Sequence, residues 1–491
     1  MSSESGAAAA GAHDLCNLTA VDAVGRMARG ELTAERYAGA LLARCRSAGA
    51  LNAFIALEPG KVLEAARARD RERLAGRPGG PLFGLPIPIK DSVNTADYPT
   101  TAGTPALRRF QPAADAPVVA ALREAGAIVL GKTNLHELSY GWTSNNLAFG
   151  AVRNPYDLSR IPGGSSGGTA AAVAGRLAPL GLAEDTEGSI RVPAALCGIA
   201  GFRPTTGRYS TRGCVPISPL FDQVGPHARS VADLALFDSA VTGARDVLDA
   251  APLHGVRLGV VRDYWLTNLD PEVERAWESA LARLRDAGAQ IVETGMPGLG
   301  PLIDATTDAV QNHDVRTSLA EYLEEYAAPV DFATLLAEAS ADIRATFHRD
   351  VLPGGARFID EQRYGEARDR HLPAVRQLYR DYFRRTGVAA MLFPTTLVPA
   401  PRIGCGVTVQ AGERMLPFDL AIARNIAPGS TAGVPGLVLP AGLTREGLPV
   451  SVELDAPAGG DRALLALGLG IERALGPIAA PCEPYRKSAS S

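Results

Sequence analysis

The chain has 491 residues, which allows two to four domains or one large domain that carries an elaboration. Its 49 Lys and Arg residues against 53 Asp and Glu residues give a net charge of −4, so no basic field attracts a polyanion and a nucleic-acid partner is disfavoured. A hydrophobic fraction of 46% with 21% charged residues excludes a disordered chain, and 52 glycines indicate many places where backbone turns tightly or approaches a ligand.

The N-terminus and the cysteines indicate the compartment. Residues 1–13 lack the basic and apolar regions of a secretory signal, and no 18 apolar residues run together. The six cysteines are scattered without a C-x-x-C pair, so we expect reduced, mostly buried thiols and neither a disulfide framework nor a zinc site. We therefore expect a cytoplasmic protein with no membrane partner and a disordered tail over residues 1–13.

Residues 14–80 are predicted to form a helical preface. A first helix is expected after Thr19, because a Thr cap followed three residues later by Asp22 is a variant of the capping box. A second helix follows Thr33, and a charged helix runs from about Lys61 to Leu74.

Residues 81–296 alternate short apolar strands, such as Leu85–Ile89 and Ala127–Leu130, with helical stretches such as Ala116–Ala125. This alternation predicts an α/β core with helices on the faces of a sheet. Residues 297–386 are helix-rich, which indicates a helical cap or insertion. The α/β pattern returns over residues 387–475, before a C-terminal tail at 476–491, so we expect one large domain with an insertion.

A phosphate-loop pattern, G-x-x-x-x-G-K-[ST], occurs from Gly126 to Thr133. A phosphate loop needs its strand before the first glycine. Here the residues between the two glycines are themselves the expected strand, so nucleotide hydrolysis is disfavoured.

A nucleophile-elbow pattern, G-x-S-x-G, occurs from Gly164 to Gly168 and would make Ser166 the nucleophile. The elbow requires a strand immediately upstream, whereas Leu158–Gly164 has the composition of a loop. No histidine downstream lies in a distinctive setting, so an α/β-hydrolase is also disfavoured.

Three other places carry residues that could act together. Lys90 closes an apolar run, where partial desolvation would lower its pKa and make it a base near neutral pH. The Gly-rich loop 163–168 lets hydroxyl and backbone N–H groups approach a small ligand. Thr186–Ser189 places successive N–H groups at a helix start, where negative charge is stabilised. Taken singly, each is better explained by a strand end, a turn or a helix cap.

Together these residues resemble the amidase signature family. The family's defining segment is similar to Gly163–Ala172 and Asp185–Thr205, and Gly84–Asp91, Gly131–Asn134 and Gly447–Val450 follow the family's order. The similarity extends over about residues 18–475. It implies the amidase signature fold, an α/β fold in which a large mixed β-sheet is flanked by helices on both faces, with a helical insertion.

The resemblance implies a Ser-Ser-Lys triad carried by Ser189, Ser165 and Lys90. Ser189 would be the nucleophile. Ser165, for which the family implies an unusual cis peptide bond, would bridge it to a neutral Lys90. No metal or organic cofactor is implied.

The same resemblance implies an oxyanion hole made by the backbone N–H groups of Thr186, Glu187, Gly188 and Ser189. Gly188 suits that role because backbone must come close to the substrate. Asp185 and Arg191 are expected to hold the loop in place without touching substrate.

Two departures from the family pattern bear on the pocket. Where most members have Gly-Thr-Asp-Thr-Gly-Gly-Ser, this chain has Ala183-Glu-Asp-Thr-Glu-Gly-Ser189, which puts the Glu187 carboxylate beside the oxyanion hole. We expect Glu187 to point to solvent; the alternative is that it selects a polar or cationic edge of the substrate. The C-terminal pattern, which usually ends in Gln, ends here in Glu453 and bears on the shape of the pocket, not on the triad.

Within the family the chain is most similar in texture to the bacterial indoleacetamide and mandelamide hydrolases. That similarity implies a small aryl or arylalkyl amide as substrate, with anilides, esters and carbamates (urethanes) open to the same acyl chemistry. The loop 140–146 and the stretch 297–385 are expected to wall the pocket, and Tyr140, Trp142, Gly163 and Gly164 to contact the substrate. A monomer or homodimer is expected.

Two other functions stay open. The glutamyl-tRNA amidotransferase component that carries these same motifs works inside a complex, and the altered C-terminal pattern and short tail favour a stand-alone hydrolase over it. A catalytically idle binding homologue is disfavoured because Lys90, Ser165 and Ser189 are all present.

Overall fold

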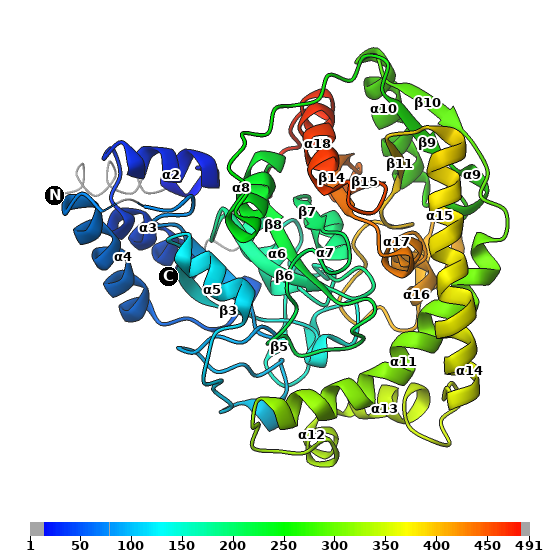
Figure 1. Cartoon of the computed structure of the whole chain (residues 1–491), viewed down its shortest axis with the longest axis horizontal. Coiled ribbons are helices and arrows are strands. Elements are labelled where there is room, and N and C mark those ends of the chain that lie inside the picture. The colour runs from blue at the N-terminus through cyan, green and yellow to red at the C-terminus, as the bar shows by residue number, and fades with distance from the viewer. Residues whose placement is uncertain (1–13, 78, 483–491) are drawn as a thin grey trace.

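Apolar runs from most of the chain meet in one mixed sheet. The computed structural model describes residues 14–77 and 79–482. Among these residues, eleven strands pair in one sheet (Figure 1), which in sheet order comprises β1 (Phe54–Ala56), β3 (Ile128–Thr133), β2 (Pro86–Lys90), β6 (Leu180–Asp185), β8 (Gln223–Ala228), β7 (Ala200–Arg203), β14 (Gly436–Leu443), β15 (Pro449–Asp455), β11 (Ala390–Pro394), β9 (Arg257–Val260) and β10 (Gln290–Glu293). The mixed α/β architecture is therefore confirmed.

Helices cover both faces of this sheet. In β14, Leu437 and Leu439 pack in the main core with α8, α10 and α18, whereas Val438 between them packs with α6 and α7. Because side chains alternate along a strand, the two sets of helices lie on opposite faces. These helices are α6 (Gly167–Ala174), α7 (Arg191–Leu196), α8 (Val231–Thr242), α10 (Pro271–Asp286) and α18 (Asp461–Leu475).

The N-terminal segment is helical but also joins the sheet. The Thr19 hydroxyl accepts the Asp22 N–H at 3.0 Å and caps the first helix, as expected. The strand β1 then pairs antiparallel with β3 at the edge of the sheet, which the sequence pattern alone did not predict. The helices of this segment are α2 (Ala20–Ala28), α3 (Ala34–Ser47) and α4 (Pro59–Leu74), followed by α5 (Pro117–Glu124) after β2.

A run of helices between β10 and β11 borders the opposite side of the molecule from α2–α4 (green to yellow, Figure 1). It consists of α11 (Leu299–Glu325), α12 (Phe332–Glu338), α13 (Ala341–Asp350), α14 (Glu361–Glu366) and α15 (Leu372–Thr386). The remaining elements are the short helices α9 (Arg262–Trp265), α16 (Phe418–Ala423) and α17 (Ala427–Ala432) and the two-stranded sheets β4 (Asn145–Asn146) with β5 (Gly150–Ala151) and β12 (Thr408–Ala411) with β13 (Arg414–Pro417). The expected tail 1–13 and most of the tail 476–491 lie outside the described residues.

One strand pairing positions the site. β2 and β6 are parallel neighbours with Ile89 opposite Leu182, so their carboxyl ends lie at the same edge of the sheet. Lys90 ends β2, and Glu184 and Asp185 end β6. Side chains that are far apart in the sequence therefore start from neighbouring points.

Candidate active site

Lys90 and Ser165 form a direct contact in the interior. Lys90 Nζ lies 2.7 Å from Ser165 Oγ, and both residues are completely buried. The Ser165 backbone is fixed on its other side, because its carbonyl accepts the His136 N–H at 3.0 Å and the Ser144 hydroxyl at 3.1 Å. The peptide bond between Gly164 and Ser165 is cis, as the resemblance implies.

Ser189 stands at the wall of a cavity of about 480 Å³. The residue is 5% exposed, whereas Lys90 and Ser165 have no exposure and are not among the cavity-lining residues in the described part of the chain. Among the described residues, no hydrogen bond joins the hydroxyls of Ser189 and Ser165, and catalytic contacts are often long before substrate binds. The other walls come from the 136–143 loop, α11, α13 and the α16–α17 segment.

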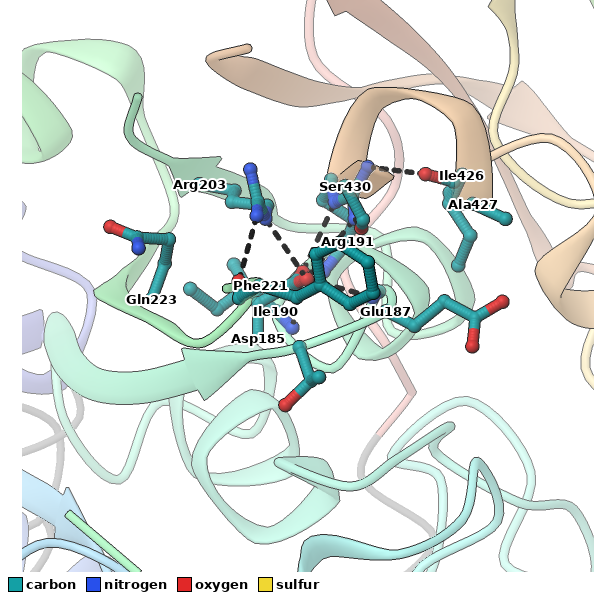
Figure 2. Close-up of polar contacts among 12 residues, drawn as sticks. Asp185, Glu187, Ile190, Arg191, Arg203, Phe221, Gln223, Ile426, Ala427 and Ser430 are labelled. Carbon is teal, nitrogen blue, oxygen red and sulfur yellow. Dashed lines mark hydrogen bonds and ion pairs between the residues drawn. The ribbon is translucent and has the colours of Figure 1, made fainter. Parts of the chain in front are cut away.

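Asp185 binds the backbone of the loop that carries Ser189, and Figure 2 shows Asp185 beside Arg191 and Arg203. Asp185 Oδ1 accepts the Gly188 N–H at 2.7 Å, its Oδ2 accepts the Ile190 N–H at 3.0 Å, and the Arg191 guanidinium binds both oxygens. Arg203 adds an ion pair at 3.3 Å. Burial acts to raise the pKa of Asp185, but Arg191 and Arg203 lower it further than burial raises it. The carboxylate therefore stays charged and keeps its hydrogen bonds to the loop.

Arg191 ties the same loop to distant parts of the chain. Its Nη1 donates to Ile426 O at 3.0 Å and to Glu453 Oε1 at 2.8 Å, and its Nη2 donates to the Ser430 hydroxyl. The side chain is completely buried. The bonding of Asp185 and Arg191 is that of residues that fix the loop.

The hydrogen bonds of Gly188 change the expected oxyanion hole. The Gly188 N–H already donates to Asp185, so its assignment as an oxyanion donor needs correction; Thr186, Glu187 and Ser189 remain as candidates. The structure also gives a different reason for a glycine at position 188 from the close approach to substrate that we expected. Its φ is +103°, and a Cβ there would overlap the Ile426 side chain, so packing beneath the loop requires the glycine.

Glu184 is a site residue that the sequence pattern did not reveal. Its Oε1 lies 2.9 Å from Lys90 Nζ, and its side chain is 9% exposed. Burial lowers the pKa of Lys90, as expected from its position, while Glu184 opposes that effect. A signal was present, because Glu184 replaces the usual threonine in the family pattern, but the sequence does not show that this carboxylate reaches Lys90.

Glu187 does not point to solvent. It is 8% exposed, it lines the cavity, and its Oε2 accepts a hydrogen bond of 2.6 Å from Gln311 Nε2 on α11. Figure 2 shows its carboxylate extending away from the Asp185 and Arg191 cluster. Burial, with Asp308 nearby, raises the pKa of Glu187 well above its usual range. The expectation failed because helix α11, whose position the sequence did not reveal, covers the side chain.

The expected pocket residues divide into two pairs. Tyr140 and Trp142 line the cavity; the Tyr140 hydroxyl donates to Asn312 Oδ1 at 2.6 Å and Trp142 Nε1 to Glu187 O at 3.0 Å. Gly163 and Gly164 are not among its lining residues in the described part of the chain. A Cβ on Gly163 would meet Pro193, and one on Gly164 would meet the backbone of residues 142–144, so both glycines serve close backbone packing.

The two disfavoured motifs have structural roles. Lys132 lies inside β3, completely buried, with its Nζ 3.3 Å from Asp91 Oδ1. The Ser166 hydroxyl is also completely buried and donates to Glu184 O at 3.0 Å. Neither motif presents its reactive group to the cavity.

Comparison with known proteins identifies the family to which this geometry belongs. The amidase family model matches residues 37–465. The chain belongs to the amidase family. It is 38% identical over 450 residues to the indoleacetamide hydrolase of Agrobacterium vitis, covering 92% of this chain and 95% of that protein. It is 38% identical over 476 residues to the mandelamide hydrolase of Pseudomonas putida, covering 94% and 92%.

Two further amidase-family relatives bear on the fold and on the alternatives. A glutamyl-tRNA(Gln) amidotransferase component from Roseiflexus castenholzii is 35% identical over 489 residues, covering 94% of this chain and 96% of that one. A solved amidase structure matches with a TM-score of 0.83 at 30% identity, covering 94% of this chain and 100% of that chain. The protein is therefore an amidase-family hydrolase that acts on non-peptide C–N bonds.

In the described part of the chain, no helix has the length and apolar character that crossing a bilayer requires.

Proposed function

We propose that this amidase hydrolyses small aryl or arylalkyl amides through an acyl-enzyme on Ser189, with Ser165 and Lys90 as its proton relay. The observation that carries the proposal is the buried 2.7 Å contact between Lys90 and Ser165, together with the position of Ser189 at the cavity wall. A lysine whose pKa is lowered by burial is a suitable base for such a relay.

In acylation, the Ser189 hydroxyl passes its proton to Ser165 Oγ while Ser165 passes its own proton to Lys90 Nζ. The Ser189 oxygen bonds to the substrate carbonyl carbon, and the carbonyl electron pair moves onto oxygen. The backbone N–H groups of Thr186, Glu187 and Ser189 stabilise that oxyanion. The relay then returns the proton to the leaving amine, and the same groups activate water to release the acid.

The cavity supports a small, partly aromatic substrate. Tyr140, Trp142, Tyr264 and Phe418 contribute aromatic rings to its lining. Its size lies within the range of ordinary small-molecule pockets. The relatives named as indoleacetamide and mandelamide hydrolases favour arylalkyl amides. Anilides, esters and carbamates (urethanes) are further candidates, because an activated serine attacks each of these carbonyls.

The test is hydrolysis of a chromogenic aryl amide by the purified chain alone. Ser189→Ala should lower kcat/KM at least about a thousandfold, because it removes the nucleophile. Ser166→Ala is the matched control: it removes the hydroxyl of the disfavoured elbow motif and should retain most of the activity. Loss of activity in Ser166→Ala with retention in Ser189→Ala would overturn the assignment.

A panel of amides, anilides, esters and carbamates, assayed without a partner protein, separates the stand-alone hydrolase from the alternatives. An amidotransferase component that needs its complex, or an idle homologue, would turn over none of them. A cytoplasmic location and a monomeric or homodimeric state stay predictions, and sedimentation of the purified chain tests the second.

A further inference from the structure

Glu184 forms the second side-chain contact of the relay lysine. Its carboxylate oxygen lies 2.9 Å from Lys90 Nζ, and the lysine's other side-chain partner is Ser165 at 2.7 Å. Lys90 is completely buried and the Glu184 side chain is 9% exposed. A charged side chain is costly to bury without a purpose or a partner, and here the partner is the one residue whose charge must change during catalysis.

Glu184 and Ser165 occupy two different hydrogen-bonding directions of Lys90 Nζ. A neutral amine has two N–H bonds and one lone pair. With one N–H directed to Glu184, the lone pair remains for the Ser165 hydroxyl proton.

We propose that Glu184 is a positioning residue of the relay, which aims the Lys90 lone pair at Ser165 and holds the ammonium that forms when Lys90 accepts the proton. The inference rests on the proposed role of Ser189, Ser165 and Lys90. Because the ammonium exists only after proton transfer begins, its attraction to Glu184 strengthens along the reaction and lowers the barrier.

Two protons move in this step. One leaves Ser189 Oγ for Ser165 Oγ, and one leaves Ser165 Oγ for Lys90 Nζ, while Ser189 Oγ bonds to the substrate carbon. Lys90 gains one positive charge and the substrate oxygen gains one negative charge. Glu184 exchanges no proton in this step.

Other charged or titratable groups face this pair and must be separated from it. Asp185, Cys214, His136 and His227 lie near Lys90. Asp222 faces Glu184. Burial, and secondly the charge of Glu184, raise the pKa of Asp222 to about 7. Asp222 binds the Thr186 hydroxyl at 2.6 Å, and a change at Glu184 therefore alters its titration as well.

The test measures kcat/KM against pH on a neutral aryl amide for wild type, Glu184→Gln and Glu184→Asp. Glu184→Gln removes the charge that opposes the lowered pKa of Lys90, so the acid limb should move to lower pH by about one unit or more. The plateau should fall about tenfold, because the amine becomes a weaker base and its ammonium loses its partner. Glu184→Asp should return the limb toward the wild-type position.

The contribution of Asp222 is removed by repeating the comparison in an Asp222→Asn background. A shift that persists there belongs to Lys90 and supports the proposal; a shift that disappears belongs to Asp222 and overturns it. Unchanged plateau and limb in Glu184→Gln also overturn it. Should Glu184→Gln fail to fold by circular dichroism, Glu184→Thr, the residue usual in the family pattern, provides the same comparison.

Failure of this inference is distinct from failure of the proposed function. If Ser189→Ala or Lys90→Ala retains wild-type turnover, the triad itself is wrong. If both lose turnover while Glu184→Gln keeps the wild-type pH profile, only the role of Glu184 is wrong.

Discussion

Gly188 shows that packing against the protein interior determines which residue can stand at this position of the active-site loop. Its N–H binds Asp185, its φ is +103°, and the space where a Cβ would stand is filled by Ile426 Cδ1. The residue next to the nucleophile is therefore fixed from the protein side of the loop. The position of Ser189 depends on contacts that never touch substrate.

We predict that Gly188→Ala lowers kcat/KM about a hundredfold, because an alanine at positive φ is strained and the loop must shift away from Ile426. Ile426→Val removes the atom nearest to the added methyl and should itself leave activity near wild type. The double variant should recover part of the loss. Steady-state kinetics on one aryl amide checks all three, and a fully active Gly188→Ala would refute this account of the glycine.

At the scale of elements, helix α11 completes the cavity against the nucleophile loop. Gln311 donates from α11 to Glu187 at 2.6 Å and to Asp308 at 3.1 Å, and Asn312 accepts the Tyr140 hydroxyl. A helix far along the chain thus converts an expected surface carboxyl into a cavity residue. The raised pKa of Glu187 then makes its charge dependent on pH.

We predict that Glu187 gives the enzyme a pH-dependent preference for substrates with a cationic edge. At low pH Glu187 is neutral and the preference should be absent; as pH rises toward its raised pKa, the carboxylate forms and attracts the cation. The measurement is the ratio of kcat/KM for an aminomethyl-substituted and an unsubstituted aryl amide, followed across the pH range in which the enzyme is active. The ratio should rise about tenfold in wild type and stay flat in Glu187→Gln, and a flat wild-type ratio would contradict the role.

Agreement between expected and observed elements follows from how local the signals are. The helix expected at Ala116–Ala125 is observed at Pro117–Glu124, because its apolar residues recur at helical spacing. The strand expected at Ala127–Leu130 continues instead to Thr133. The sequence pattern ended the strand before Lys132, because a charged residue is unusual in a buried strand. In the structure Lys132 is buried in the strand with Asp91 as its ion-pair partner. The sequence pattern could not show this partner, because it comes from another segment.

On the scale of the whole molecule, buried carboxyl groups beneath the active site link stability to pH. Burial raises the pKa of Asp222 to about 7, and it also raises the pKa values of Glu453 and Asp455, which lie against Arg191. Each of these groups binds a proton more tightly in the folded protein, so stability falls as pH rises from the unfolded value near 4 through the folded one. Asp185 acts in the opposite sense, and its contribution is lost only in acid.

We predict that Tm falls by about 2–4 °C from about pH 6 to about pH 8, since an unfolding entropy of about 2 cal/mol/K per residue makes a chain of this length shift by roughly 1 °C per kcal/mol. Glu453→Gln, which installs the residue usual in the family pattern, removes one titrating group and should flatten the slope. Thermal unfolding followed by circular dichroism in buffers of matched ionic strength measures both. A wild-type Tm that rises over this range would contradict the prediction.

By itself, the sequence determined the α/β class, because that depends on local periodicity, and its motifs gave the resemblance to the amidase signature family. That resemblance implied Lys90, Ser165 and Ser189 as candidates. The sequence could not place Glu184 on Lys90, cover Glu187 with α11, or assign the Gly188 N–H to Asp185. Each of those contacts joins backbone or side-chain groups whose directions are set by strand pairing, loop geometry and helix packing. Tertiary structure alone decided them, because charge, burial and hydrogen bonding at a site depend on which segments meet there.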